Sequence, residues 1–231
     1  MIRNYNDFIT ALLESGFSGA VGGKEDGVFG LFRYGWGAED ETGLQWHTDD
    51  PDTDPWQWRM RVLTERKDIA YSKLFFRKAG YITKEWYPYF LTARRDNMDF
   101  EDEYSSGTLS YFSKRIYYTI AENGCLSLQD IKRIAGFKRE DNYKVESALT
   151  ELQMKMYLTI CDIGYKVSLA GEKYGFSYTV FDTVESFWGN DVFDKAAIID
   201  VSEAVDRITE QIIKLNPTAN EKKIIKFISG V

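Results

Sequence analysis

Residues 142–157 constrain the fold of this chain more than any other stretch. Their apolar side chains recur at helical spacing and form one stripe, while the opposite face of the same helix is polar. A strand-like pattern follows over residues 157–167, and a short helix that ends near Gly136 precedes the stretch. A helix, a short helix, a polar-faced helix and a two-stranded ribbon, in this order, are typical of a winged helix-turn-helix, whose third helix usually contacts DNA. The apolar stripe consists of Val145, Ala148, Leu149, Leu152 and Met156.

Capping signals and hydrophobic periodicity predict an α+β fold around this unit. We expect an aromatic-rich α/β N-terminal region at 1–104, a winged-helix domain at 105–190 and a C-terminal helical extension at 191–231. A linker rich in Asn, Asp, Glu, Ser and Gly is expected at 97–107. The expected helices cover residues 6–15, 55–67, 83–95, 109–123, 128–134, 142–157, 201–215 and 219–228. The expected strands cover residues 28–36, 69–76, 125–126 and 157–167, with a turn or short strand at 79–82 and a wing turn at 170–173.

The charge is distributed unevenly along the chain. The total of −7 argues against a protein that coats nucleic acid. Residues 105–175 carry 10 Lys and Arg against 8 Asp and Glu, a net of +2, whereas residues 1–104 (13 against 19) and 176–231 (6 against 9) are negative. The predicted winged helix is therefore the positive part of the chain, and its small excess implies modest, salt-sensitive affinity for DNA.

The sequence offers no pattern for a cofactor, a metal or a membrane segment. Cys125 and Cys161 lack Cys-x-x-Cys spacing, and the single histidine, His47, cannot assemble a His-based metal site. No apolar run approaches membrane-spanning length. We therefore expect a cytoplasmic, reducing setting, with no cofactor and no membrane partner.

Residues 49–54 form an acidic loop with two interpretations. Spaced carboxylates are able to hold Ca²⁺ or Mg²⁺, but the glycine and the closing glutamate of a calcium loop are missing. The alternative is structural: Asp54 as N-cap, Pro55 at the first helical position and Gln57 two residues later make a capping box for the helix at 55–67. We favour the capping interpretation.

Basic and hydroxyl side chains of the predicted winged helix are candidates for phosphate contacts. Glu140, Asp141, Glu146 and Glu151 would repel the same phosphates, so a solvated face of mixed charge is the alternative interpretation. The candidate nucleic-acid-binding residues are Lys132, Arg133, Lys144, Ser147, Lys155, Lys166 and Lys173.

A second candidate surface combines aromatic rings with basic side chains, as a pocket for stacked or flipped bases requires. The alternative is that the rings form the core of the N-terminal region, because large aromatic side chains are mostly buried. The residues of this predicted aromatic–basic pocket are Trp58, Arg59, Tyr71, Lys73, Trp86, Tyr89, Arg94 and Arg95.

Several short blocks between residues 50 and 190 resemble those of AlkZ-related proteins, which are similar to the YcaQ-type winged-helix DNA glycosylases. The resemblance implies a winged helix and descent from a protein that binds damaged DNA. The blocks are Asp54-Pro55-Trp56-x-Trp58-Arg59, Ala70-Tyr71-x-Lys73, Ala79-Gly80-Tyr81-Ile82, Trp86-x-Pro88-Tyr89-Phe90, Leu152-Gln153-Met154-x-x-Tyr157-Leu158 and Phe187-Trp188-Gly189.

The glycosylases carry a catalytic Gln-x-Gln or Gln-x-Asp motif that places a water at the sugar of the damaged nucleotide. Gln153 matches the first position of that motif, but Lys155 stands at the second, where an acceptor must orient the water. We assign no catalytic residue and keep Gln153 as a candidate. Its alternative role is that of an ordinary helix residue at the edge of the packed face.

Three functional hypotheses follow from these patterns. The first is a DNA-binding winged-helix protein of the AlkZ-related group without strong sequence specificity. The second is a glycosylase-like enzyme that acts on a damaged base, and the third is a winged helix that binds another protein. A positive surface over residues 142–157 and the wing favours the first over the third, and a pocket that contains Gln153 and a carboxylate favours the second.

Overall fold

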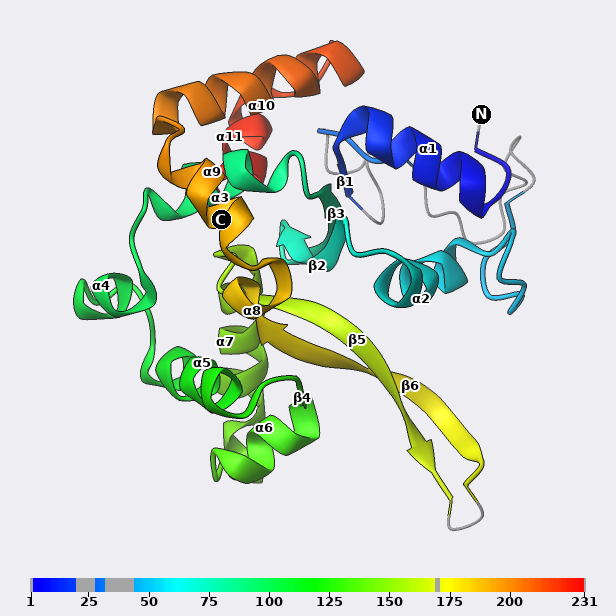
Figure 1. Cartoon of the computed structure of the whole chain (residues 1–231), viewed down its shortest axis with the longest axis vertical. Helices are drawn as coiled ribbons and strands as arrows, with labels where there is room; N and C mark the ends of the chain where they lie inside the picture. The colour runs from blue at the N-terminus through cyan, green and yellow to red at the C-terminus, as the bar shows by residue number, and fades with distance from the viewer. Residues whose placement is uncertain (1, 20–27, 32–43, 169–170, 231) are drawn as a thin grey trace.

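A computed structural model gives the fold of residues 2–19, 28–31, 44–168 and 171–230. These residues form a mixed α and β structure, in agreement with the predicted α+β class. A single antiparallel sheet with strand order β1-β3-β2-β5-β6-β4 runs through it (Figure 1). Its strands are β1 (Phe17–Gly19), β2 (Ile69–Phe75), β3 (Lys78–Thr83), β4 (Leu126–Ser127), β5 (Leu158–Val167) and β6 (Lys173–Thr183).

Helices pack around this sheet, and several begin where capping signals predict. Asn4, Asp54 and Ser127 each accept a hydrogen bond from a backbone N–H of the first helical turn, which has no partner inside the helix. The helices are α1 (Tyr5–Ser15), α2 (Pro55–Glu65), α3 (Tyr87–Arg95), α4 (Phe100–Ser105), α5 (Tyr111–Asn123), α6 (Leu128–Ile134), the 3-10 turn η1 (Arg139–Asp141), α7 (Asn142–Met154), α8 (Val184–Trp188), α9 (Asn190–Ala197), α10 (Val201–Leu215) and α11 (Glu221–Ser229).

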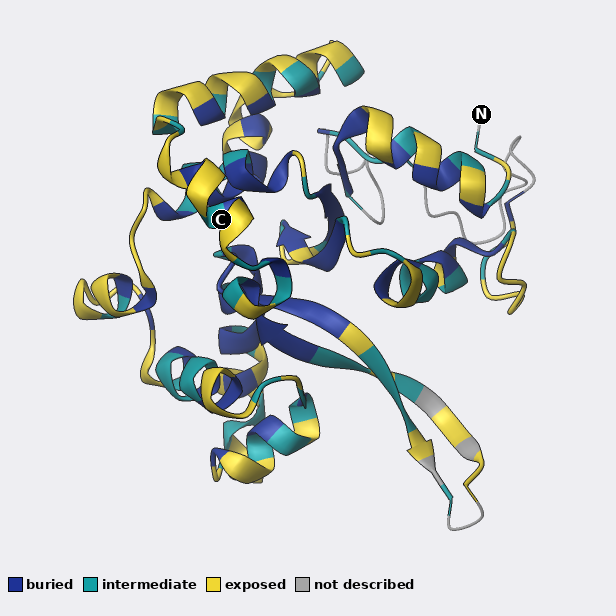
Figure 2. Cartoon of the chain, viewed as in Figure 1, coloured by how far each residue is buried: buried dark blue, intermediate teal, exposed yellow. Residues whose placement is uncertain are grey.

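β2 divides the hydrophobic core into two clusters, because successive side chains of a strand point to opposite faces of the sheet. Ile69 and Tyr71 belong to the first hydrophobic cluster, which α1, α2, α5, α6 and α7 complete. Ala70 and Leu74 belong to the second hydrophobic cluster, together with α3, α8, α9, α10 and α11. Figure 2 shows β2 and the base of the β5–β6 hairpin as buried, whereas the hairpin becomes more exposed toward its tip.

The order of elements predicted for residues 108–181 is observed. α5, α6 and α7 precede the β5–β6 hairpin, and β4 pairs with β6. The apolar stripe of α7 is buried at Val145, Ala148, Leu149 and Leu152. α7 ends at Met154 rather than at residue 157, because Met156 adopts a left-handed conformation with φ of 61°.

The linker expected at residues 97–107 is wrong, since α4 lies within it. Asp99 Oδ1 accepts a hydrogen bond from Asp102 N at 2.8 Å and caps this helix. Phe100 stacks on Tyr117 of α5, with ring centroids 3.9 Å apart. The segment is polar apart from a few apolar side chains, and the burial of the Phe100 ring among them holds α4 against the rest of the protein.

Three expectations in the N-terminal region need correction. Gln57 does not complete a capping box, because the backbone N–H of Asp54 donates to Asp50 O at 3.0 Å, and Gln57 Nε2 donates to Asp49 Oδ1 at 3.0 Å. α3 begins at Tyr87 rather than at residue 83, with Pro88 in its first turn. The strand predicted at 28–36 lies partly outside the described residues, and in its described part a β-bridge forms at Gly30 alone, to Gly19.

Contacts join the three regions expected from the sequence. Tyr71 of β2 pairs with Ile160 of β5 across the expected boundary at residue 104. Arg94 donates hydrogen bonds to the carbonyl oxygens of Met154 and Ile228, both at 2.8 Å. The C-terminal ends of α7 and α11 are therefore held together by one guanidinium from α3.

Candidate nucleic-acid interface

α7 has two halves with different surroundings. In its second half Thr150, Gln153 and Met154 are buried, and Gln153 bonds to β2. In its first half Tyr143 is 84% exposed, and Lys144 is also exposed. The first two turns of α7 are thus the part open to a partner, and the first turns of a recognition helix are those that contact base edges in helix-turn-helix proteins.

A groove of about 540 Å³ runs along α7 from Tyr143 to Lys155. Lys144 and Ser147 line it from α7, Lys155 lines it just beyond the end of the helix, and Arg77 lines it from the turn between β2 and β3. Glu151 contributes a carboxylate to the same wall. The basic side chains outnumber it, so the groove, which we call the α7 groove, favours an anionic ligand.

Arg77 is absent from the predicted site, and a strained turn carries it to the α7 groove. Phe75 pairs with Lys78, so Phe76 and Arg77 form a two-residue hairpin turn, with φ of 50° and 61° respectively. Such turns favour Asn and Gly, and a left-handed conformation costs other residues roughly 1–2 kcal/mol each. The guanidinium of Arg77 donates from Nη2 to Ser147 Oγ at 3.2 Å, so the strain accompanies a basic group held over α7.

Three predicted nucleic-acid-binding residues are already paired with carboxylates. Lys132 Nζ lies 3.6 Å from Glu146 Oε1, and Arg133 Nη2 lies 2.9 Å from Asp130 Oδ1. Both pairs are solvent-exposed and therefore weak. The third is Lys155, which bonds to Glu103.

The pair of Lys155 and Glu103 is part of the packed structure. Glu103 is 4% exposed and also accepts a hydrogen bond from the Tyr157 hydroxyl at 2.6 Å. Burial alone would raise the pKa of Glu103, but the hydrogen bonds from Lys155 and Tyr157 outweigh burial and hold this pKa below its ordinary value. Lys155 therefore compensates a buried carboxylate, although it borders the α7 groove.

The other predicted nucleic-acid-binding residues lie on α7 and on the hairpin. Lys144 and Ser147 line the α7 groove, and the Lys144 ammonium lies 5.4 Å from the ring centroid of Phe112. Lys166 is exposed on β5. Lys173 lies on β6, and its side chain is outside the described structure. The structure thus brings together Lys144, Ser147 and Lys155 along the α7 groove, and Lys166 is not among the residues that line it.

The rings of the predicted aromatic–basic pocket are divided between the two faces of the sheet. Trp58 and Tyr71 lie in the first hydrophobic cluster, whereas Trp86 lies in the second, with Tyr89 packed at its edge. Trp58 is fully buried and Trp86 is 8% exposed. The rings occupy the core, which is where the alternative interpretation expected them.

The basic members of that predicted pocket lie apart from one another, although Arg59 still contacts Tyr71. Arg59 stacks on Trp56 near the surface, with 3.4 Å between its guanidinium carbon and the ring centroid. Lys73 Nζ donates to Thr150 Oγ1 of α7 at 3.2 Å, so Lys73 belongs beside α7. Arg95 pairs with Glu185 at 3.0 Å, and Arg94 reaches the carbonyl oxygens described above. These residues do not line one common pocket among those of the described structure.

A family model described as AlkZ related matches residues 2–229. The chain belongs to the AlkZ-related family. The match spans the sheet, α7 and the hairpin, so it includes the α7 groove. No curated protein and no solved structure matches the chain. Within the described ranges, the helices are too short or too polar for any of them to cross a membrane.

In this AlkZ-related chain, Gln153 faces the interior. It is 2% exposed, and its Oε1 accepts hydrogen bonds from Ser72 Oγ at 2.8 Å and Lys73 N at 3.1 Å. Its Nε2 donates to Leu149 O at 2.9 Å. The amide is used by the protein to attach α7 to β2, and Gln153 is not among the residues that line the α7 groove.

The acidic loop is organised by Asp54. This fully buried residue accepts at Oδ1 from Trp56 N at 2.8 Å and at Oδ2 from Thr48 N at 3.0 Å and Asp49 N at 3.2 Å. The predicted N-cap of α2 is therefore confirmed. Asp54 therefore serves as a buried cap that joins the acidic loop to the first turn of α2.

Proposed function

We propose that this AlkZ-related protein binds DNA through a winged helix-turn-helix formed by α5, α6, α7 and the β5–β6 hairpin. The order of these elements supports the proposal, as does the antiparallel pairing of β4 with β6, which adds a third strand to the hairpin. In this proposal α7 is the recognition helix and the hairpin is the wing. The wing extends away from the body of the protein (Figure 1).

The observation that carries the proposal is the basic, exposed first half of α7. Lys144 projects from α7, and Arg77 is held against Ser147 by a turn whose conformation is unfavourable for arginine. Phosphate oxygens are the ligands that lysine and arginine favour at such a surface. We assign Lys144, Arg77 and Ser147 to the phosphate backbone.

The charge of the unit limits its affinity. Residues 105–175 have a net charge of +2, and Lys132, Arg133 and Lys155 are engaged with carboxylates. We expect micromolar-scale binding at low salt, as in ordinary non-specific complexes, with little dependence on sequence. β2 covers the second half of α7, which leaves a short surface for reading base edges.

The test is a fluorescence anisotropy titration of a labelled duplex over a range of salt concentrations. The double variant Arg77→Ala/Lys144→Ala should make the negative slope of log K against log salt shallower by about two units. Each phosphate contact releases about one condensed counterion from the DNA, so each lost contact removes about one unit of slope. The affinity should fall about equally on unrelated duplex sequences, since phosphates carry no base identity.

Lys214→Ala is the matched control for this experiment. Lys214 is exposed on α10, so its replacement removes one positive charge, against two in the double variant, at the end of the molecule away from α6 (Figure 1). It should leave the salt slope unchanged. Absence of binding by the native protein at low salt, or a native slope in the double variant, would overturn the DNA proposal in favour of a protein-binding winged helix.

The glycosylase hypothesis receives no comparable support. Its candidate residue Gln153 is 2% exposed, and its amide oxygen already accepts from Ser72 Oγ and Lys73 N, so both acceptor positions of that oxygen are occupied. Glu151 is the carboxylate of the α7 groove, and its Oε2 accepts from Ser113 Oγ at 2.9 Å. We therefore propose binding to DNA without assigning a catalytic step.

A further inference from the structure

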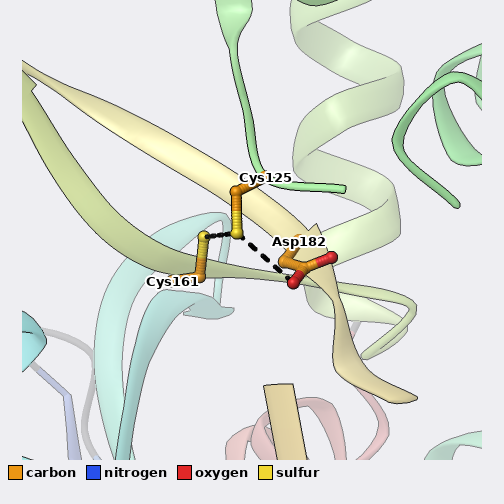
Figure 3. Close-up of side chains that lie close together, drawn as sticks. All are labelled: Cys125, Cys161 and Asp182. Atoms are coloured by element: carbon orange, nitrogen blue, oxygen red, sulfur yellow. Dashed lines mark hydrogen bonds between the residues drawn. The ribbon is translucent and has the colours of Figure 1, made fainter. Parts of the chain in front are cut away.

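Three side chains with metal-binding atoms converge at the base of the β5–β6 hairpin (Figure 3). Cys125 lies between α5 and β4, Cys161 on β5 and Asp182 on β6. The two Sγ atoms are 3.2 Å apart, and Cys125 Sγ lies 3.4 Å from Asp182 Oδ2. All three ligand atoms lie within 4.8 Å of one another, and we call the group the thiol–carboxylate site.

A β-bulge places Cys161 in this site. Ile160 pairs with Phe181 and Asp162 pairs with Val180, so Cys161 is the extra residue on β5. A bulge changes the direction of the side chain of the inserted residue, and bulges are frequent beside functional sites. The bulge and the loop after α5 thus bring together two cysteines from separate elements.

The carboxylate of Asp182 is positioned by the protein around it. Asp182 is 6% exposed, and it accepts from Ser186 Oγ at 2.7 Å and from Thr183 N at 2.8 Å. Within the described part of the chain, no lysine or arginine forms an ion pair with Asp182. Hydrogen bonds of this kind orient carboxylates that ligate metals, and a cation would compensate the buried charge.

We propose that Cys125, Cys161 and Asp182 bind one Zn²⁺-like cation. With Zn–S of about 2.3 Å and Zn–O of about 2.1 Å, a tetrahedral site separates two sulfurs by about 3.8 Å and a sulfur from an oxygen by about 3.6 Å. The observed separations of 3.2 Å and 3.4 Å need an adjustment of about 0.6 Å or less to reach these values. Two thiolates and a carboxylate suit zinc and cobalt better than magnesium or calcium.

The same geometry argues against a disulfide between the two cysteines. A disulfide requires the sulfurs to approach to about 2.05 Å, which is about 1.1 Å closer than the observed 3.2 Å. The exposed Cys125 gives a cation access from solvent, and bound metal would tie the loop after α5 to both hairpin strands.

The test is a titration of the full-length reduced protein, stripped of metal by a chelator, with Co²⁺. One equivalent should produce thiolate-to-cobalt charge-transfer absorption and the visible bands of tetrahedral Co²⁺, and Zn²⁺ should abolish both. Zn²⁺ should also raise the thermal midpoint, whereas Mg²⁺ should not. Ser186→Ala, which removes a hydrogen bond to Asp182, should weaken Co²⁺ binding about 10-fold or more.

Cys125→Ser is the decisive variant, because Cys125 is exposed and its replacement leaves the core intact. It should lose the charge-transfer absorption, whereas the control Asp162→Asn, at an exposed neighbouring carboxylate, should retain it. No cobalt spectrum at one equivalent, or an unchanged spectrum in Cys125→Ser, would refute the site. Rapid formation of a Cys125–Cys161 disulfide in air without metal binding, seen as a loss of two thiols and two mass units, would also refute the metal site. It would show that the two cysteines form a redox pair.

Discussion

Replacing Gln153 with methionine tests whether this residue holds the fold together. Methionine retains the length of the side chain and a high helix propensity but removes the amide. In the native protein the amide oxygen accepts from Ser72 Oγ at 2.8 Å and from Lys73 N at 3.1 Å. Gln153→Met leaves both donors without that acceptor at a position that is 2% exposed.

The expected cost follows from these two donors. A buried donor that loses its partner costs about 1–3 kcal/mol, and the Ser72 hydroxyl can rotate toward another acceptor, so it lies at the low end of the range. Lys73 N has no such freedom. We expect Gln153→Met to lower the free energy of unfolding by about 2–4 kcal/mol. The lost bond from Nε2 to Leu149 O adds little, since that carbonyl lies within α7 and can accept from the helix backbone.

Urea unfolding followed by circular dichroism and tryptophan fluorescence measures this change. Tyr143→Met is the matched control, because it introduces the same residue on the same helix at a side chain that is 84% exposed. The control should change stability by about 0.5 kcal/mol or less. Combining Gln153→Met with Ser72→Ala should show a coupling energy of about 1 kcal/mol, since either single variant already removes the hydrogen bond from Ser72 Oγ to Gln153 Oε1.

A stability of Gln153→Met within about 0.5 kcal/mol of the native protein would refute the structural role. Additive effects of Gln153→Met and Ser72→Ala would show that the bond between these side chains contributes nothing measurable. Either result would return Gln153 to consideration as a residue kept for chemistry.

Three further predictions concern other parts of the molecule. Asp54→Ala should lower the free energy of unfolding by about 2–3 kcal/mol in thermal unfolding. The loss exceeds the roughly 1 kcal/mol of a single cap, because Asp54 accepts from three backbone N–H groups. Ca²⁺-dependent stabilisation of the native protein that the variant loses would instead indicate a metal-binding loop. Arg77→Gly should raise stability by about 0.5–1 kcal/mol in urea while weakening binding to a duplex, and a loss of stability would contradict the strain argument. The pKa of Glu103 is lowered in the folded protein, so its stabilising contribution is present above the unfolded pKa of about 4.3 and is lost as pH falls through the folded pKa. Glu103→Gln should therefore be less stable than the native protein at neutral pH, and its thermal midpoint should fall less steeply as the pH drops below about 4.5. Equal falls of the thermal midpoint in the two proteins would contradict this role of Glu103.

Local sequence signals were sufficient for most of the helices. Ser127 and Asp130 predict the start of α6, and the structure has both hydrogen bonds of the pair, including Asp130 N to Ser127 Oγ at 3.1 Å. The stripe that begins at Val145 predicts α7 and its buried face. Such signals work because a cap or a helical stripe involves residues within one or two turns of each other. α4 was not predicted, because it is held in place by one ring, Phe100, whose partner Tyr117 lies on another helix.

The sequence by itself determined the order of the elements from α5 to the β5–β6 hairpin, the caps of α2 and α6, the buried stripe of α7 and membership of the AlkZ-related family. Only the tertiary structure decided which faces remain available. It turned Gln153 toward Ser72, which is distant in sequence, and it set Arg77 over the first half of α7. It also brought Cys125 within 3.2 Å of Cys161 through a bulge in β5. Each of these contacts depends on strand register and on packing between distant segments, and neither periodicity nor local spacing encodes those pairings.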